Sequence, residues 1–391
     1  MSKLIDACNI CTGKLDANQG CKNGAYPFFT CAPEPLRINN YAFDCNAILL
    51  AGNNAQGNFH VQRYNGKFNA YQRTYVLTAK EGFDIDYIKY SIEVALSNFK
   101  RLSKGSQTKF LTLDTIRDLY IGEKNFADQG KTVAILRSID NKIAVNKKIN
   151  DNLQQQLGLM YGYWFTQFDF PDENGNPYRS SGGKMQYSSR LKKDIPEGWT
   201  VESVISNSIS EPINPGVDPF LKKTYLATAD VNGTSLSSGS QINYENRESR
   251  ANMQPTVSSV WFAKMKNSIK HLFLNSELQH LIDETILSTG FCGLQCTDNS
   301  FEYVAAFIEH SYFEAVKNTF AHGATQEAVN NDDLLGIAMV IPSAKIIESF
   351  HIAAKPLYAQ ISRNICENQT LSELRDWLLP MLMNGQATIK D

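Results

Sequence analysis

The sequence predicts an α+β fold in which two globular α/β domains are separated by two long antiparallel helices, as an internal duplication with pseudo-twofold symmetry. The first observation is a long apolar stripe at helical spacing in residues 136–164, and the second is a copy of this stripe 218 residues later. A turn-rich segment, 169–184, lies between them and is typical of a domain boundary. We therefore expect five segments, namely a first domain (1–128), a first helix (129–168), a linker (169–198), a second domain (199–342) and a second helix (343–391).

The first long helix is predicted from residues that alternate between three and four positions apart. This spacing places them on one face of a helix, which then needs a partner helix. Two asparagines lie inside the stripe, where polar residues usually fix the register or the partner. The stripe consists of Leu136, Ile139, Ile143, Asn146, Asn150, Leu153, Leu157, Met160 and Trp164.

The second long helix repeats this pattern, so the same chain supplies the partner. We expect Asn146 and Asn150 to face Asn364 and Asn368 near a pseudo-twofold axis. Arg375 stands where the first copy has Leu157. The copy includes Ala354, Leu357, Ile361, Asn364, Asn368, Leu371, Leu378 and Leu382.

Local signals place the ends of the second helix. Ser343 is the expected N-cap, and Pro380 with Gly385 is expected to end the helix. Pro356 lies inside it and predicts a kink or a break, because proline lacks the amide hydrogen.

Each domain combines short strands with one helix before its long helix. In the first domain we expect strands at 26–31, 47–51 and 73–78 and a helix at 86–102. In the second we expect strands at 225–228 and 257–263 and a helix at 301–320. Gly323 follows Gly105 by 218 residues, so the duplication extends into the domains.

Composition excludes several classes of protein. The 391 residues are 42% hydrophobic and 20% charged, which suits a soluble chain of two or three domains. The net charge of −2 excludes a uniformly basic nucleic-acid binder, so a polyanion site needs an uneven distribution of charge. No apolar run is long enough for a membrane helix, and 1–11 lacks a secretory signal, so the eight cysteines are expected to be reduced in the cytoplasm.

Three segments, 46–79, 94–113 and 249–276, contain basic but no acidic residues. Lys and Arg bind phosphates, and Arg, Asn and Gln recognise base edges, so these segments are candidates for DNA contact. The alternative is a solvated loop surface, because such runs are common. The candidate loops are 58–73, 104–109, 247–254, 264–270 and 322–326. The candidate DNA-binding residues are Asn58, Gln62, Arg63, Lys67, Tyr71, Arg73, Lys104, Gln107, Lys109, Arg247, Arg250, Asn252, Lys264, Lys266, Thr325 and Gln326.

A zinc site and an active site are both disfavoured. Cys8 and Cys11 form a C-x-x-C pair, but no second such pair supplies the remaining ligands. Asn176-Pro-Tyr178 only partly matches the Asn-Pro-Pro-Tyr/Phe motif of adenine methyltransferases. Phosphate-binding loops, dinucleotide fingerprints and nucleophile-elbow motifs are absent from the sequence. We therefore predict no catalytic residue and no metal ligand.

The chain resembles the specificity (S) subunit of type I restriction–modification systems. The similarity rests on the helix phrases 139–153 and 367–380, on 163–170, 180–185, 195–199 and 381–385, and more weakly on 65–68, 249–252 and 261–265. The second domain opens with 195–199 before its first strand, whereas the first opens at Leu4. Relative to the family, either the first domain lacks an edge strand or the sequence begins late.

The resemblance implies a non-catalytic subunit whose two target recognition domains each recognise half of a bipartite DNA site. It implies two modification (methyltransferase) subunits docked on the helices, with restriction (motor-nuclease) subunits joining for cleavage. S-adenosylmethionine is then expected on the methyltransferase partners, and no cofactor on this chain. About 30 helical residues span ~45 Å, which exceeds one DNA turn of ~34 Å. The alternative is an adaptor whose paired helices and domains bind only proteins.

Overall fold

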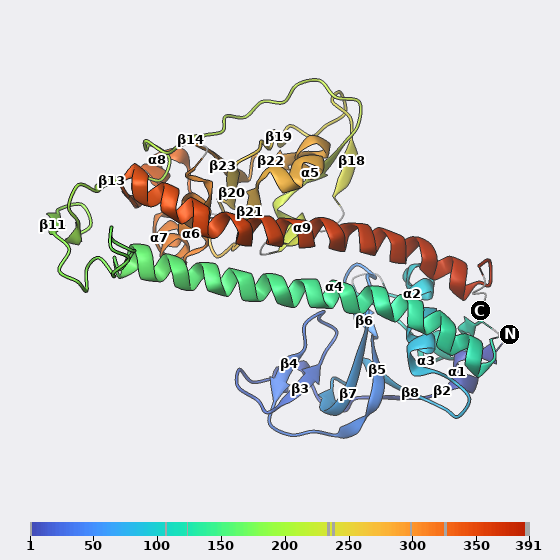
Figure 1. Ribbon diagram of the computed structural model, residues 1–391. Coiled ribbons are helices and arrows are strands. Elements are labelled where there is room, and N and C mark those ends of the chain that lie inside the picture. Colours follow the sequence, from blue (N-terminus) through green and yellow to red (C-terminus); the bar gives the residue numbers. More distant parts are fainter. Residues whose placement is uncertain are drawn as a thin grey trace. The chain divides into compact units, whose positions relative to one another are not determined.

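The computed structural model describes residues 2–105, 108–122, 124–232, 235–236, 239–297, 299–323 and 327–387. The chain divides into two compact units. The first unit is Met1–Ile143 with Thr370–Asp391, and the second unit is Ala144–Gln369. Each unit contains one globular domain together with a part of both long helices (Figure 1). Among the helices described, none combines the length and the apolar character needed to cross a membrane.

The two long helices are α4 (Phe126–Tyr161), which continues into a π-helical turn (Gly162–Thr166), and α9 (Ala344–Met383). The break expected at Pro356 does not occur, and Pro380 does not end the helix. A proline removes one helical hydrogen bond, and burial of the flanking Ala354 and Tyr358 offsets that loss. The helix stops just before Gly385, whose φ of +73° favours glycine.

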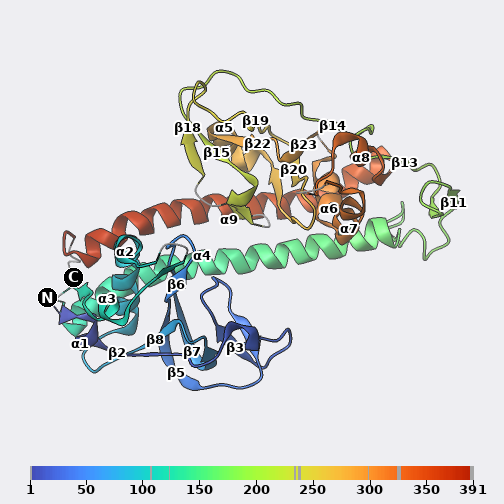
Figure 2. The same ribbon diagram turned by 180° about the vertical axis from the view of Figure 1, so that it is seen from behind.

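The first domain is built on one mixed six-stranded sheet, in which only the β3–β7 pair is parallel. Figure 2 shows β3, β5, β7 and β8 from behind. Helix α2 (Ile85–Leu102) packs Ile88, Ile92 and Phe99 against the sheet, as the apolar spacing predicted. In spatial order the strands are β2 (Cys8–Thr12), β8 (Thr74–Ala79), β5 (Phe43–Ala51), β7 (Val61–Ala70), β3 (Tyr26–Phe29) and β4 (Leu36–Ile38).

The second domain contains two four-stranded sheets. One consists of β14 (Ser210–Pro212), β23 (Phe291–Cys296), β20 (Ser259–Ala263) and β21 (His271–Leu274). The other consists of β18 (Ser240–Ile242), β15 (Lys223–Leu226), β22 (Thr285–Ser288) and β19 (Ala251–Met253). Short elements complete it: η3 (Thr228–Asp230), β16 (Val231–Asn232), β17 (Ser235–Leu236), η4 (Ser276–Leu278) and α5 (Gln279–Glu284).

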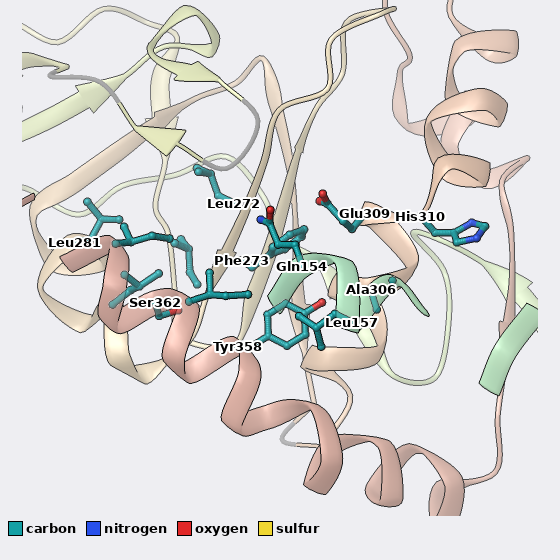
Figure 3. A pocket seen from close by; sticks show the side chains of 15 residues that line it. Gln154, Leu157, Leu272, Phe273, Leu281, Ala306, Glu309, His310, Tyr358 and Ser362 are labelled. Carbon is teal, nitrogen blue, oxygen red and sulfur yellow. The ribbon is translucent and has the colours of Figure 1, made fainter. Parts of the chain in front are cut away.

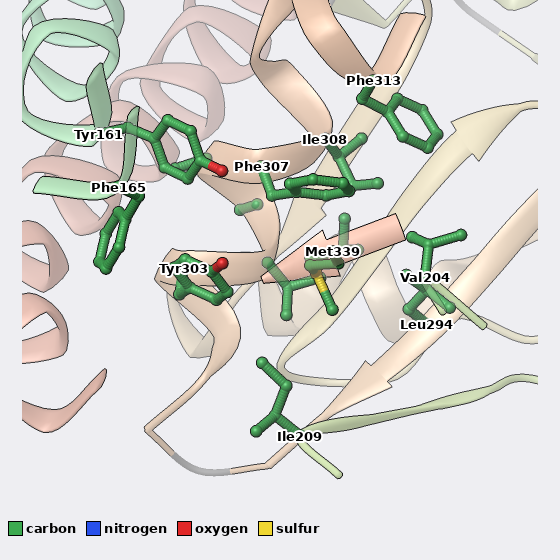
Figure 4. Packing of buried hydrophobic residues seen from close by; sticks show 14 of the residues in the cluster. Tyr161, Phe165, Val204, Ile209, Leu294, Tyr303, Phe307, Ile308, Phe313 and Met339 are labelled. Atoms are coloured by element: carbon green, nitrogen blue, oxygen red, sulfur yellow. The ribbon is translucent and has the colours of Figure 1, made fainter. Parts of the chain in front are cut away.

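The helix predicted at 301–320 is in fact two helices, α6 (Phe301–Glu309) and α7 (Ser311–Phe320). His310 has extended dihedrals, and its Nδ1 accepts a hydrogen bond from the Tyr312 amide, so it ends one helix and caps the next. Figure 4 shows Tyr303, Phe307 and Ile308 of α6 within the large apolar core of the second unit.

Both domains open with the same strand pair. In the first, β1 (Ser2–Lys3) pairs with β10 (Tyr120–Ile121), and in the second β13 (Thr200–Ser203) pairs with β24 (Ala338–Ile341). The amide of Leu4 donates to the Leu119 carbonyl over 2.8 Å, and the amide of Val204 donates to the Ile337 carbonyl over 2.9 Å. The first domain therefore has the opening strand that we considered missing, in a two-residue form.

The 218-residue repeat is also visible in the segments that precede each long helix. The backbone bridge between Lys104 and Phe110 recurs between His322 and Ala328. Helix α3 (Leu113–Arg117), capped by Thr112, recurs as α8 (Asn331–Leu335), capped by Asn330. The remaining short elements of the first domain are α1 (Leu4–Ala7), η1 (Ala17–Gln19), β6 (Asn53–Asn54) and β9 (Lys109–Phe110).

The predicted linker is an ordered part of the second unit. It contains the hairpin of β11 (Met185–Ser188) and β12 (Lys193–Pro196). Phe170 stacks on Tyr178 and on Trp199, with ring centroids 4.6 and 5.0 Å apart. The boundaries of the predicted domains stay a prediction.

Candidate DNA interface

The helix pair is joined by asparagines in the second unit. Asn146 Nδ2 donates to Asn368 Oδ1 over 3.0 Å and to Glu367 Oε2 over 2.7 Å, and Asn364 Nδ2 donates to Asn150 Oδ1 over 2.7 Å. Because Asn146 and Asn150 repeat as Asn364 and Asn368, each asparagine contacts the copy of the other. The predicted facing of the four asparagines is therefore observed. The other predicted interface residues are buried or half-buried, namely Leu136, Ile139, Ile143, Leu153, Leu157, Leu357, Ile361 and Leu371.

One pair of equivalent positions differs in chemistry between the two units. In the second unit Leu157 and Tyr358 line an apolar pocket between the two helices and the second domain (Figure 3). The equivalent residues in the first unit are Arg375 and Asp140, whose Nη1 and Oδ1 are 3.3 Å apart. Tyr90 of α2 donates to the same carboxylate over 2.8 Å. An ionic contact therefore replaces an apolar one, which explains why Arg375 breaks the apolar repeat.

In the first domain, two predicted stretches far apart in sequence come together. Strands β6 and β9 pair, which brings loop 52–59 beside turn 104–110. Asn54 Oδ1 accepts from the amides of Gln56 and Asn58 and so shapes the loop. Lys100 Nζ donates to Asn58 Oδ1 over 2.9 Å. Amide and ammonium groups thus converge here, and the exposed Lys104 forms a backbone bridge with Phe110 of β9.

The predicted loop 58–73 is mostly strand β7, which the sequence did not reveal. Successive residues of a strand point to opposite faces, and so Gln62 and Arg63 have different surroundings. Gln62 Nε2 donates to the Pro33 carbonyl over 2.6 Å. Arg63 Nε donates to Asp86 of α2 over 2.9 Å, and its Nη1 donates to the carbonyls of Ala47 and Tyr64. Internal contacts therefore hold the Arg63 guanidinium, and its role in DNA contact stays a prediction.

Three other candidates of the first domain lie in the second half of the predicted loop 58–73. Lys67 Nζ lies 4.7 Å from the centre of the Tyr41 ring, whose hydroxyl raises the pKa of the lysine. Tyr71 is half-buried and Arg73 is exposed. The Arg73 carbonyl accepts from Gly52, which places Arg73 at the start of loop 52–59.

In the second domain, Thr289 and Gly290 contact the predicted segments 247–254 and 264–270, and Lys264 also contacts Val329, which follows the predicted segment 322–326. The Arg250 carbonyl accepts from Thr289, and the Lys264 amide donates to the Gly290 carbonyl. The Lys264 carbonyl in turn accepts from Val329. Backbone hydrogen bonds therefore bring Arg250, Lys264 and Val329 together, although Arg250 and Val329 lie 79 residues apart in the sequence.

The candidate side chains in this cluster differ in their exposure and in the contacts that they make. Arg250 is exposed, and Asn252 is half-buried. Lys266 pairs with Glu327 over 2.9 Å. Arg247 stacks on Tyr244, with its guanidinium carbon 3.9 Å from the ring centre. Three candidates, Gln107, Thr325 and Gln326, lie outside the described residues.

A buried charged cluster below turn 264–270 was not predicted. His271 donates from Nδ1 and Nε2 toward Glu309 and Glu314, over 2.9 and 3.0 Å. Burial lowers the pKa of His271, but the hydrogen bonds to the two carboxylates raise it by more. Lys317, which is 0% exposed, pairs with Glu314 over 2.8 Å. The sequence offers no signal for this cluster, because its members come from a strand and two helices.

Three of the eight cysteines, Cys8, Cys292 and Cys296, are buried. The Cys8 thiol donates to the Leu4 carbonyl, and burial raises the pKa of Cys8 and of Cys292 to about 12. A neutral thiol is a poor metal ligand. Within the described ranges, no group of three or more His, Cys, Asp or Glu side chains is placed to hold a metal ion.

Comparisons with known proteins agree with this architecture. Residues 1–155 match the family model described as the type I restriction modification DNA specificity domain. The chain is 33% identical over 211 residues to the type I restriction enzyme EcoDI specificity subunit of Escherichia coli. That match covers 51% of this chain and spans about half of the relative's length, 46%. The MjaIX specificity subunit of Methanocaldococcus jannaschii is 23% identical over 332 residues, covering 80% of this chain and 71% of that protein.

The fold as a whole has a counterpart among solved structures. The S subunit of a type I restriction–modification system from M. genitalium superposes with a TM-score of 0.53 and 12% identity, over 97% of this chain and 95% of that one. This likeness confirms the predicted fold class. In sequence the chain is similar to specificity subunits of type I restriction enzymes, and residues 1–155 match the model of the DNA specificity domain of that family.

Proposed function

We propose that the chain is a sequence-specific DNA-binding subunit in which each domain recognises one half of a bipartite site. The observation that carries this proposal is the repeat itself. Each domain places a backbone bridge, Lys104–Phe110 or His322–Ala328, beside basic and amide side chains, and one long helix follows each bridge in the sequence. Two similar modules on a fixed spacer suit two half-sites on one duplex.

In this proposal the chain performs no chemistry. It gives a target sequence to adenine methyltransferase subunits, which carry S-adenosylmethionine, and to restriction subunits that act as motor nucleases. We expect this assembly in the cytoplasm. The chain alone should bind no S-adenosylmethionine in equilibrium dialysis, whereas the complex with methyltransferase should bind it. Tight binding of the cofactor by the chain alone would contradict this division of labour.

Exposed apolar side chains on the helices support docking of two copies of one partner. Leu159 on α4 and Trp377 on α9 are equivalent positions of the repeat, one in each unit. They are 76% and 60% exposed. Large apolar side chains on a solvent-facing helix are a common feature of protein-binding surfaces. We therefore assign one modification subunit to each.

Mapping methylated adenines in the source genome, with and without this chain, tests the function directly. We expect one bipartite motif to lose methylation when the chain is removed. Affinity of the purified complex for that motif should fall steeply with salt, by about 0.9 log units per log of salt for each phosphate contacted. A chain that binds its protein partners but shows neither a motif nor salt-dependent DNA binding would instead be a protein-interaction adaptor.

A further inference from the structure

The turn between β20 and β21 presents an isoleucine to solvent among lysines. Its sequence, 264–270, is Lys-Met-Lys-Asn-Ser-Ile-Lys, and Ile269 is 60% exposed. The turn lies in the basic cluster of the second domain, where Lys264 contacts the Gly290 backbone. Isoleucine is the one β-branched aliphatic residue in this turn, and both it and the polar Asn267 are exposed.

Helix α7 holds this turn from below. Asn267 has a φ of +54°, and its amide donates to Asn318 Oδ1 over 2.8 Å. Lys317 Nζ donates to the carbonyls of Ala263 and Ser268, over 2.9 and 3.3 Å. Helix α7 therefore holds Ala263, just before the turn, and Asn267 and Ser268, the two residues before Ile269.

The residues after Ile269 are fixed as well. Lys270 Nζ donates to the Thr228 carbonyl. His271, the next residue, is buried between Glu309 and Glu314. Buried hydrogen bonds of this kind make a segment rigid. The fold thus holds Ile269 in place without covering its side chain.

We propose that Ile269 is a specificity determinant that contacts the C5-methyl group of a thymine, and that Asn318 and Lys317 position it; this inference rests on the proposed function. Thymine is the only standard base with a methyl group in the major groove, where apolar side chains recognise it. The exposed Arg250 of the same cluster suits a phosphate that flanks such a contact.

Single replacement of each thymine by deoxyuridine in the half-site of the second domain tests this proposal, because it removes only the methyl group. The full complex of this chain with its methyltransferase is titrated with each duplex. Wild type should lose about fourfold in affinity at one position, the factor expected for burial of one methyl group. Ile269→Ala should bind the thymine site more weakly and should not distinguish deoxyuridine at that position. Leu221→Ala, at a 95% exposed position of the same domain, is the matched control and should behave as wild type.

Variants of Asn318 test its positioning role separately. Asn318→Ala should reduce the discrimination between thymine and deoxyuridine, and Asn318→Asp, which keeps the acceptor for the Asn267 amide, should retain it. The proposal is overturned if no thymine is sensitive, if the half-site contains none on either strand, or if Ile269→Ala discriminates as wild type does. It is also overturned if Ile269→Ala only weakens binding of a protein partner. Loss of all sequence preference by the wild-type complex would overturn the proposed function, and this inference with it.

Discussion

Asn364 donates a hydrogen bond to Asn150 across the helix pair, and the two amide groups are 2.7 Å apart. The equivalent contact joins Asn146 to Asn368 over 3.0 Å. A shift of either helix by one turn would break both of these contacts and would leave two of the four asparagines without an asparagine opposite. The asparagines therefore select one register of the pair.

Removal of one member of this pair should destabilise the chain. Asn150→Ala leaves the buried Asn364 Nδ2 without its acceptor, at a cost of about 1–3 kcal/mol. Urea unfolding of the full chain measures this loss. Replacement of both residues by leucine should restore most of the stability, because no unpaired amide remains. Asn152→Ala on the exposed face of α4 is the control, and an equal loss there would contradict the argument.

The helix pair should act as a ruler. Insertion or deletion of one turn in the first long helix should change the number of base pairs between the half-sites and leave the half-site sequences unaltered. The physical reason is the rise of about 1.5 Å per helical residue. Methylation mapping gives the new motif. An unchanged spacing after such an insertion would refute the ruler.

The variant Arg63→Ala tests whether Arg63 contributes to DNA recognition, to stability or to both. We expect Arg63→Ala to weaken recognition of one half-site only, and its contact with Asp86 predicts a loss of stability as well. Asp86 also pairs with Arg137, so in the Arg63→Ala variant the Asp86 carboxylate keeps one cationic partner. Binding to the intact site, to each single half-site change and to scrambled DNA separates the two roles. An equal loss for scrambled DNA would reduce Arg63 to a phosphate contact.

Leu159 and Trp377 should each be needed for the docking of one methyltransferase subunit. A charge at either position makes burial under a partner costly. Leu159→Glu and Trp377→Glu should each leave complexes with a single partner copy, and the double variant should leave none. Mass measurement of the assembled complex counts the copies. Both helices should stay folded in the variants, since both positions are exposed; two copies on the double variant would show that the docking surface lies elsewhere.

His271 should make stability depend on pH. Burial lowers its pKa and the contacts with Glu309 and Glu314 raise it by more, so the folded value lies above the ordinary value of 6.5. The histidine therefore contributes its full stabilisation below about pH 6.5, and this contribution is lost as the pH rises through the raised pKa. The neighbouring Lys317 also pairs with Glu314, and burial lowers the pKa of this lysine.

Unfolding free energies at pH 6 and pH 9 measure the effect. His271→Gln should remove this part of the pH dependence. His280→Gln, at an exposed position beside Glu284, should leave it unchanged. The same pH dependence in wild type and His271→Gln would assign it to other groups.

The sequence by itself determined the helix pair, the asparagine register and the duplication, because helical periodicity and repeats are local patterns that survive in one dimension. It also located the basic segments. Only the tertiary structure decided where the side chains of those segments lie and what they contact. Backbone hydrogen bonds brought Arg250, Lys264 and Val329 together, whereas the contact with Asp86 turned Arg63 inward. Helix α9 continues through Pro356, because the flanking Ala354 and Tyr358 are buried. Contacts between distant residues decided each of these outcomes, and no local propensity encodes them.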